Sequence, residues 1–512
     1  MASCDTRKDF TFVIIGGGIS GVSCVEYLSS LCSEETIALI TATDIVKATC
    51  NLKKFGRTLE EFDVEERSAS LLFEQSPNVV SIQSVVVGVH PQEHSIITES
   101  GNKYYYKKLC ICTGGTPNLI TRHPCVIGIR DTESVLQLKS KLSQARRVAI
   151  VGNGGIALEL VYEMYDCQVL WAIKDETIGN AFFDEGAATF FLPHIETNQQ
   201  VWKEKKKFMT HTVKRMKYGI ETVENNKHEA CYHGNPSNTL SGGALGPDWC
   251  SDFSLCGASS KEKGYRQVHV EYKCEFKQLL NPEELKRCGE KESPFPSIND
   301  SLLDSADWPV YIQLSNGKIY GCDFIVSATG VVPNTQSFVS CAPFDTAEDG
   351  GLLVNSNMQT NLVDIYAAGD VCTFGWDPAP HWLQMRLWSQ ARQMGMFAAK
   401  CIAAHFSNEK IPLDFCFELF THVTQFFGYK VVLLGKFNAQ GLGNDYELLL
   451  RCAKGDEYVK VVLHEDKMCG AVLIGETDLE ETFENLILNQ TDLSAIKDIL
   501  LNPEIDIEDY FD

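Results

Sequence analysis

The sequence has no apolar run of the roughly 20 residues that a membrane-spanning helix requires. It is also poor in positive charge, with 45 Lys and Arg against 68 Asp and Glu and a net charge of -23. That charge repels phosphate groups, so direct binding to nucleic acid or to an anionic membrane is not expected. The N-terminal residues lack the apolar stretch of a secretory signal and the Arg- and Ser-rich character of a transit peptide. We therefore expect a soluble chain in a reducing compartment.

Ordered cysteine patterns are missing too, although the chain has 20 cysteines. Disulphide frameworks belong to small secreted chains with little core, whereas 512 residues are enough for several cores. One polar region gathers metal-ligand residue types, but their spacing matches no zinc template: Cys231, His233, Cys250 and Cys256. No metal site is predicted, and most cysteines are expected to pack as small buried residues.

What the sequence does have is a glycine-rich turn near its start, in the segment FVIIGGGISG. An apolar strand runs into Gly16, Gly18 and Gly21, spaced as G-x-G-x-x-G, and helical apolar periodicity follows. In such a turn the first glycine permits the tight bend, the second lets a pyrophosphate approach the backbone, and the third lets helix and strand pack closely. The segment predicts a dinucleotide-binding cradle.

A second cradle follows in VAIVGNGGIALEL, where Gly152 and Gly154 fill the first two positions. Ala157 fills the third, which is a permitted variant because alanine still packs closely. The chain therefore predicts two dinucleotide sites.

The residues that would bind the riboses are less regular. An acid is expected about 20 residues after each turn. After the first cradle Thr41 stands there, with Thr43 and Asp44 as alternatives. After the second, an isoleucine is followed by Lys174 and Asp175, so the sequence does not choose between NAD and NADP.

Three later segments, KLCICTGGTP, FIVSATGVVPN and TNLVDIYAAGDVC, each end an apolar strand in a short polar or glycine turn. Their turn residues are Thr113 and Gly114, Thr329 and Gly330, and Gly369 and Asp370. In their order along the chain, the five motifs resemble those of the two-dinucleotide flavoproteins, the pyridine nucleotide-disulphide oxidoreductases. The resemblance extends over residues 10 to 395.

This resemblance implies an α/β fold with two Rossmann-like domains, the second inserted in the first, and an α+β C-terminal domain. The implied ranges are 1–145 and 325–405 for the FAD domain, 146–324 for the NAD(P) domain with polar insertions at about 199–265 and 281–305, and 411–512 for the C-terminal domain with an acidic tail. Residues 380–402 predict a long helix, whose start would lie against the flavin pyrimidine. The insertions are expected to be loops or a partner surface.

The resemblance also assigns cofactors and their residues. It places FAD on Gly16, Gly18, Gly21, Thr41, Thr113, Gly114, Gly369 and Asp370, with Asp370 bonding the flavin ribitol. It places NAD(P)H on Gly152, Gly154, Ala157, Lys174, Thr329 and Gly330. Hydride would pass from the nicotinamide to the flavin across a shared cleft.

The chain departs from this family in its sulphur chemistry. Disulphide reductases carry a C-x4-C or C-x2-C pair, and neither spacing occurs here. By position Cys50 is the candidate for a redox cysteine, with Lys47, Lys53 and Lys54 as electropositive neighbours. The C-terminal histidine-proline motif of the glutathione reductase-like branch is absent as well, and His422 is expected to be structural.

The expected function is thus an FAD-dependent oxidoreductase that passes hydride from NAD(P)H to flavin and then to a small acceptor. Oxygen or a quinone could take electrons without a sulphur relay. Alternatively, the NAD(P)H-bound flavoprotein protects a partner or senses its redox state. By resemblance that partner is a tRNA ligase complex, and the protein lies in nucleus and cytoplasm.

Overall fold

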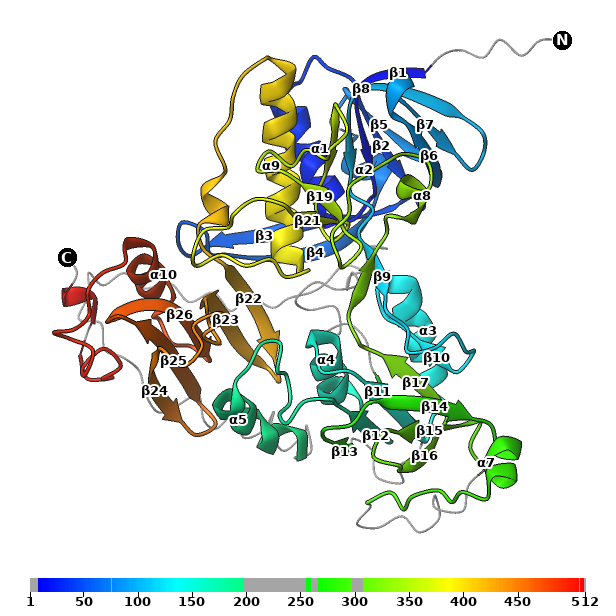
Figure 1. Cartoon of the computed structure of the whole chain (residues 1–512), viewed down its shortest axis with the longest axis vertical. Coiled ribbons are helices and arrows are strands. Elements are labelled where there is room, and N and C mark those ends of the chain that lie inside the picture. The colour runs from blue at the N-terminus through cyan, green and yellow to red at the C-terminus, as the bar shows by residue number, and fades with distance from the viewer. Residues whose placement is uncertain are drawn as a thin grey trace, which may run out of the picture.

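The computed structural model describes residues 8–74, 76–196, 255–258, 266–296, 307–505 and 507–510. These residues form two sheet-and-helix domains and a third body near the C-terminus, and Figure 1 shows the three around a central junction. Of the helices in these ranges, none is both long and apolar enough to cross a membrane.

The first domain is built on a seven-stranded sheet, with β20 beside β8. Its main order is β5 (Val79–Gln83), β2 (Ile37–Thr41), β1 (Lys8–Ile15), β8 (Lys103–Ile111), β7 (Ser95–Thr98) and β6 (Val86–His90), and β20 spans Ile365–Ala367. The apolar run of β1 is buried because parallel neighbours flank it and helices cover it. Helices α1 (Ile19–Leu31) and α9 (Trp388–Phe406) pack against each other so closely that a Cβ on Gly395 would lie 2.2 Å from the Ser20 carbonyl oxygen.

Between β2 and β5 the chain forms an antiparallel hairpin of β3 (Ile45–Lys54) and β4 (Glu60–Ser68), followed by α2 (Ala69–Leu72). Smaller elements complete the domain: α8 (Gln336–Val339), the parallel pair β19 (Leu352–Val354) and β21 (Cys372–Phe374), and the 3-10 turns Pro91–Glu93 and Phe415–Phe417.

The second domain has a five-stranded parallel sheet. In order its strands are β10 (Val126–Ile127), β17 (Phe324–Ser327), β11 (Arg147–Val151), β12 (Cys167–Ala172) and β13 (Arg266–Glu271). Helices α3 (Thr132–Leu142), α4 (Gly155–Glu163) and α5 (Glu185–Glu196) pack on one face. The antiparallel strands β14 (Phe276–Leu280), β15 (Val310–Leu314) and β16 (Ile319–Cys322) pack on the other.

Strand pairing places the domain boundaries at other residues than those predicted from the sequence. Strand β10 and helix α3 belong to the second domain although they precede residue 146, because β10 pairs with β17 and α3 packs in the second core. Strand β17 belongs there too, because it pairs with β11, so the return to the first domain comes after 327 rather than at 325.

The predicted polar insertions are only partly described. Within 281–305 the expected loop instead contains α7 (Pro282–Cys288), whose first turn is capped by the Asn281 side chain and begins with proline. Residues 197–254, 259–265 and 297–306 lie outside the described residues.

The long helix predicted from residue 380 begins at Trp388, because the preceding segment bonds to a side chain instead of continuing the helix. The Gln390 amide accepts from the Met385 N–H at 2.7 Å and donates to the Leu383 carbonyl at 2.7 Å. This contact holds residues 383–387 in a non-helical segment.

Two segments connect the domains, and they pair with each other. Strand β9 (Gly115–Pro117) leaves the first domain and β18 (Val331–Pro333) returns to it, forming an antiparallel ladder. The motifs with Thr113 and Thr329 therefore lie at the two domain crossings.

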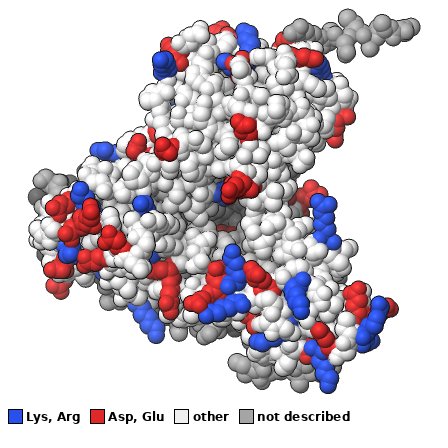
Figure 2. Space-filling model, viewed as in Figure 1, with Lys and Arg blue, Asp and Glu red and all other residues white. Residues whose placement is uncertain are grey.

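The C-terminal domain is a five-stranded antiparallel sheet with one helix, α10 (Glu480–Asn489). Its strand order is β22 (Thr421–Phe426), β23 (Tyr429–Gly435), β26 (Lys467–Ile474), β25 (Glu457–His464) and β24 (Glu447–Ala453). One sheet face packs on aromatic residues of the second domain, and the other packs on α10. Figure 2 shows acidic side chains gathered on this domain, at the left. Within the predicted acidic tail, Ile507 of the 3-10 turn Ile507–Tyr510 is buried in the same core.

Candidate functional site

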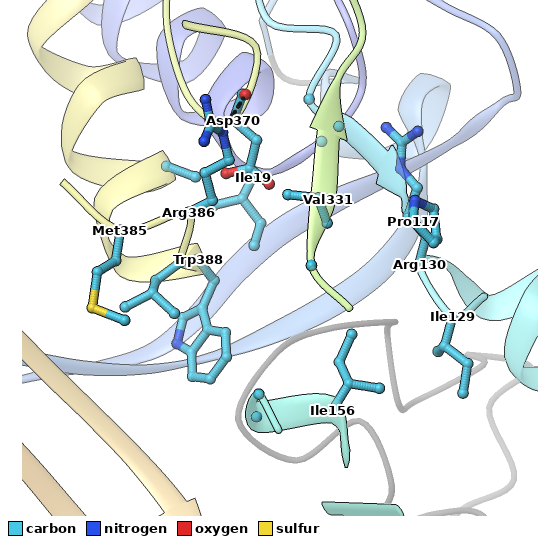
Figure 3. Close-up of a pocket in the computed structure, with 18 of the residues that line it drawn as sticks. Ile19, Pro117, Ile129, Arg130, Ile156, Val331, Asp370, Met385, Arg386 and Trp388 are labelled. Carbon is cyan, nitrogen blue, oxygen red and sulfur yellow. Dashed lines mark hydrogen bonds between the residues drawn. The ribbon is translucent and has the colours of Figure 1, made fainter. Parts of the chain in front are cut away.

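A cavity of about 470 Å³ lies where the three domains meet. Its size is that of a small-molecule site. Both cradles contribute, through Gly18 from the first and Gly154 from the second, and the C-terminal domain contributes His422 and Phe426. Figure 3 shows Ile19 and Asp370 on one side of this cavity and Ile156 across from them.

In the first cradle, two glycines are required by the backbone and one faces open space. Gly16 has φ +117°, and a Cβ there would lie 2.2 Å from the Cys112 carbonyl oxygen. A Cβ on Gly21 would lie 2.0 Å from the Gly16 carbonyl oxygen, which fits the predicted close packing of helix on strand. A Cβ on Gly18 would meet nothing within 4 Å. The space that a pyrophosphate needs is therefore present at the N-terminus of α1.

The second cradle repeats this geometry. Gly152 has φ +127°, and its Cβ would lie 2.1 Å from the Ala328 carbonyl oxygen, whereas Gly154 again faces open space. Ala157 is fully buried against the sheet. Both cradles thus fit a dinucleotide, with the second glycine of each at the N-cap of its helix.

The Thr-Gly motifs at the two domain crossings contribute glycines to the cavity wall, while their threonine side chains bond elsewhere. Gly114 and Gly330 line the cavity. The Thr113 hydroxyl donates to the Asn334 carbonyl at 3.0 Å, and the Thr329 hydroxyl donates to the Asn118 carbonyl at 2.7 Å. Both threonines therefore hold the paired crossing segments together.

Two ribose candidates lie away from the cavity lining. Thr41 is buried, and its hydroxyl donates to the Thr43 carbonyl within the same turn. Lys174 is exposed after β12. Its neighbour Asp175 accepts from the Asn153 side chain at 2.7 Å, beside the second cradle.

Asp370 lines the cavity directly after Gly369, as the motif predicts. Burial raises the pKa of its carboxyl, and the positive charges of Arg386, Arg130 and Lys47 oppose that rise. All three cations also line the cavity. Three cations therefore lie around the buried acid of the first cradle, and they could also contact the phosphates of a dinucleotide.

The cations are held by neighbouring groups. Arg386 pairs with Asp349 at 2.8 Å and donates to the Asp370 carbonyl at 3.0 Å. Arg130 donates to the Thr113 carbonyl at 3.2 Å. Lys47 lies on β3, and burial lowers its pKa despite the nearby acid Glu66.

Cys50 lies in β3 beside acidic side chains. The prediction that lysines make its surroundings electropositive is therefore wrong. Cys50 lies opposite Asp63 in the hairpin ladder, and its thiol donates a hydrogen bond to the Glu65 carboxylate. Burial and these acids raise the pKa of its thiol to about 12. Lys47, the neighbour proposed to activate it, lines the cavity instead. A thiol in this environment is a poor nucleophile near neutral pH.

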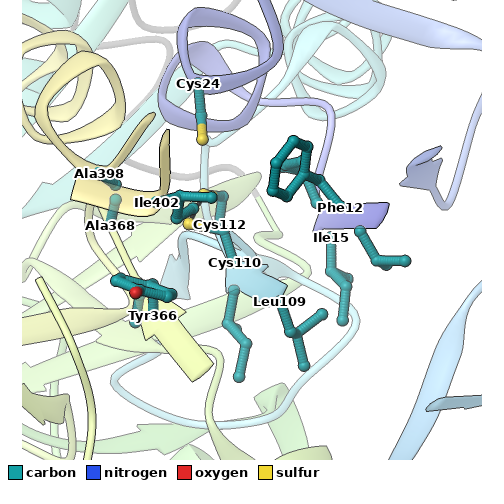
Figure 4. Packing of buried hydrophobic residues seen from close by; sticks show 14 of the residues in the cluster. Phe12, Ile15, Cys24, Leu109, Cys110, Cys112, Tyr366, Ala368, Ala398 and Ile402 are labelled. Atoms are coloured by element: carbon teal, nitrogen blue, oxygen red, sulfur yellow. Dashed lines mark hydrogen bonds between the residues drawn. The ribbon is translucent and has the colours of Figure 1, made fainter. Parts of the chain in front are cut away.

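The other close cysteines lie in the core of the first domain, and one of them, Cys112, also lines the cavity. Figure 4 shows Cys24, Cys110 and Cys112 packed with apolar side chains of the first domain. The sulphur atoms of Cys110 and Cys112 are 3.5 Å apart, on one face of the strand as predicted. Hydrogen bonds with the thiols of Cys112 and Cys24, together with burial, raise the pKa of Cys110 well above its usual value. No group of metal-ligand residues large enough to hold an ion occurs in the part of the chain that the structure describes.

Sequence reasoning missed several lining residues. No sequence motif marks the three cations Lys47, Arg130 and Arg386. They can be recognised as site residues only in the folded chain, where all three lie near Asp370. Trp388 was expected within a helix rather than at its start. His422 was expected to be structural, but it lines the cavity and is 1% exposed.

Comparisons with known proteins agree with this architecture. The sequence model of the pyridine nucleotide-disulphide oxidoreductases matches residues 10–228 and 302–395, and that of the rubredoxin NAD+ reductase C-terminal domain matches residues 423–491. A rat protein named pyridine nucleotide-disulfide oxidoreductase domain-containing protein 1 is 52% identical over 509 residues, covering 99% of each chain. Its Drosophila melanogaster namesake is 45% identical, covering 98% of this chain and 99% of its own.

Solved structures show the same fold at low sequence identity. The NADH:rubredoxin oxidoreductase of Clostridium acetobutylicum has a TM-score of 0.54 at 16% identity, covering 96% of this chain and 98% of its own. The water-forming NADH oxidase of Lactobacillus brevis has a TM-score of 0.61 at 14% identity, covering 97% and 95%. With two matching cradles, a shared cavity and relatives over its whole length, the chain belongs to the pyridine nucleotide-disulphide oxidoreductase family.

Proposed function

We propose that the protein is an FAD-containing oxidoreductase that takes hydride from NAD(P)H and gives electrons to a small acceptor without a cysteine pair. The observation that carries this proposal is one cavity lined by the open glycine of each cradle, Gly18 and Gly154. Family membership supports binding of FAD and a nicotinamide cofactor. When bound, these groups supply hydride transfer from nicotinamide to flavin.

The chain's own residues would bind and orient the two dinucleotides. The N-termini of α1 and α4 carry partial positive charge and unpaired backbone N–H groups, which favour pyrophosphates. Asp370 would bond a ribitol hydroxyl of FAD, and Arg386 holds the backbone at that acid. The C-terminal sheet, through His422 and Phe426, and the hairpin β3–β4, through Lys47, form part of the cavity wall.

The state of the Cys50 thiol supports a small acceptor that takes electrons directly from the flavin. The nearest thiol to the usual relay position, Cys50, is held protonated by burial and by Glu65. Oxygen or a quinone needs no sulphur relay, because either can take electrons at the flavin. Among solved structures with the same fold, one is named an NADH:rubredoxin oxidoreductase and another a water-forming NADH oxidase, and neither name includes a disulphide acceptor.

Which nicotinamide cofactor the protein uses stays open. Lys174, which is exposed, would favour a 2'-phosphate, whereas Asp175, which accepts from Asn153, would favour a 2'-hydroxyl. The role as protector or sensor of a tRNA ligase complex and the location in nucleus and cytoplasm stay predictions.

Turnover of the purified holoprotein tests the proposal. NADH and NADPH should each be offered with oxygen, a quinone and a disulphide, and the Gly154→Val variant serves as the control without a second cradle. We expect oxidation with oxygen or the quinone, none with the disulphide, and loss of activity in the control. Oxidation that proceeds only with the disulphide would contradict the acceptor class, and a parent protein that binds no FAD would contradict the function.

A further inference from the structure

His422 reaches the cavity from the C-terminal domain and lies between the two cradles. It is on β22, opposite Leu433 of β23. Its ring centroid is 4.7 Å from that of Trp388, the first residue of α9, and 6.5 Å from that of Phe182 in the second domain. Phe182 and Phe426 in turn lie beside Gly155, at the start of α4. The imidazole therefore stands where elements of both cradles converge.

One ring nitrogen of His422 is engaged. Its Nδ1 lies 3.0 Å from the Ser389 hydroxyl on the first turn of α9. Among the described residues, this is the one hydrogen-bond partner of that hydroxyl. A hydroxyl can donate or accept, but donation to Nδ1 is what gives the buried Ser389 proton a partner, and we therefore infer that Ser389 donates to Nδ1. The proton of the neutral imidazole must then sit on Nε2.

The other ring nitrogen has no partner. Nε2 is buried and unbonded among the described residues, although His422 lines the cavity. A buried polar atom without a partner costs free energy, and one in a cavity wall can find its partner in a bound ligand. Burial lowers the pKa of His422 to about 3, which keeps the ring neutral and Nε2 a hydrogen-bond donor across the physiological range.

We propose that the Nε2–H of His422 donates to a carbonyl oxygen of the ring cofactor bound in this cavity, with Ser389 fixing the tautomer. The flavin pyrimidine and the nicotinamide carboxamide both offer such an oxygen. The inference rests on the proposed function, since it needs these cofactors in the cavity. It makes the C-terminal domain part of the cofactor site rather than only a support for the other domains.

The test compares substitutions at His422 by cofactor affinity. His422→Phe fills the same space among Trp388 and Phe182 but cannot donate, whereas His422→Gln keeps an N–H donor at the Nε2 position. FAD affinity is measured by titrating the flavin-free protein, and NAD+ and NADP+ affinity by flavin fluorescence of the holoprotein. Thermal unfolding of the flavin-free protein is measured alongside.

Thr424→Val is the matched control. Thr424 lies on the same strand two residues along, is buried, and has a hydroxyl without a partner among the described residues, yet it does not line the cavity. Its substitution should leave all affinities within about twofold.

We expect His422→Phe to weaken one affinity by about tenfold, as loss of one buried hydrogen bond does, and His422→Gln to restore most of it. A loss confined to FAD assigns the flavin carbonyl, and a loss confined to NAD+ or NADP+ assigns the carboxamide. The flavin-free His422→Phe protein should have about the stability of the parent, because the unpaired Nε2–H is gone but the buried Ser389 hydroxyl loses its partner.

Unchanged affinities in His422→Phe, with or without loss of stability, would overturn the inference while leaving the proposed function intact. If His422→Phe does not fold, Ser389→Ala replaces it in the test. Without the Ser389 hydroxyl the imidazole proton can move between Nδ1 and Nε2, so the same affinity should weaken about threefold. An unchanged affinity in Ser389→Ala would then overturn it. A parent protein that binds no cofactor would instead contradict the proposed function.

Discussion

The two cradles have the same backbone geometry but differ in the side chains that surround them. Each has a glycine at positive φ that meets a carbonyl, followed by a glycine that faces open space. The first cradle adds Asp370 and Arg386, Arg130 from a distant segment, and the hairpin β3–β4. The second has no such ring of charges among its described residues. The difference suits a cofactor that stays bound in the first and one that exchanges in the second.

The largest expected effect comes from the glycines that the backbone requires. Gly16→Ala should destabilise the first domain by at least about 2 kcal/mol, because it combines a strained φ with a Cβ pressed on the Cys112 carbonyl. Gly101→Ala is the control: Gly101 also has a positive φ, +79°, but open space around it, so only about 1 kcal/mol should be lost. Chemical unfolding measures both, and equal losses would contradict the packing assigned to Gly16.

The open glycines should separate the two cofactors. Gly18→Val and Gly154→Val both place a side chain in free space, so neither should disturb folding. Gly18→Val should weaken FAD binding about 10- to 100-fold, and Gly154→Val should weaken only NAD(P)H binding by a similar factor. Flavin absorbance and the rate of flavin reduction measure the two effects. Full flavin retention in Gly18→Val would mean that the first cradle does not hold FAD.

Acid should weaken the second domain through Glu271, at the end of β13. Burial opposes ionisation of this carboxyl, but hydrogen bonds from Lys318, Tyr320 and His269 outweigh burial and lower its pKa to about 2. Because the folded pKa lies below the unfolded one, the stabilisation is complete above about pH 4.5 and is lost as the pH falls toward 2.

Glu271→Gln should therefore cost up to about 3 kcal/mol at pH 7, and the gap to the parent should narrow as the pH falls below about 4.5. Unfolding followed at several pH values checks this. A gap that is constant with pH would show that Glu271 acts by packing alone.

The smallest effect is expected at Cys50. Because burial and Glu65 keep its thiol protonated, Cys50→Ser should change flavin reduction and reoxidation by oxygen by no more than about threefold. Stopped-flow measurement of the two half-reactions tests this, with the exposed Cys288→Ser as control. A loss confined to the oxidative half-reaction would show that Cys50 takes part in turnover.

The sequence was informative where function depends on local backbone. The glycines of both cradles, the turn at Asp370 and the absence of a cysteine pair are local patterns, and the glycines and Asp370 fall where their spacing predicts. Sequence was poor where function depends on tertiary contact: Lys47, Arg130 and Arg386 meet only after three distant segments fold together. His422 gives no local signal, because its orphan Nε2 exists only in the packed C-terminal domain. The first domain boundary could not be predicted for the same reason. The pairing of β10 with β17 places β10 in the second domain, and neither strand's sequence indicates that pairing.

Anaerobic titration of the holoprotein with NADH or NADPH tests the central claim that the flavin is the one redox centre. The account predicts full flavin reduction by about one equivalent of NAD(P)H per flavin, with no increase in titratable thiols, because the sequence has no C-x4-C or C-x2-C pair and burial and Glu65 raise the pKa of the Cys50 thiol. Uptake of two equivalents, with two new thiols per chain, would reveal a redox-active disulphide and contradict the account.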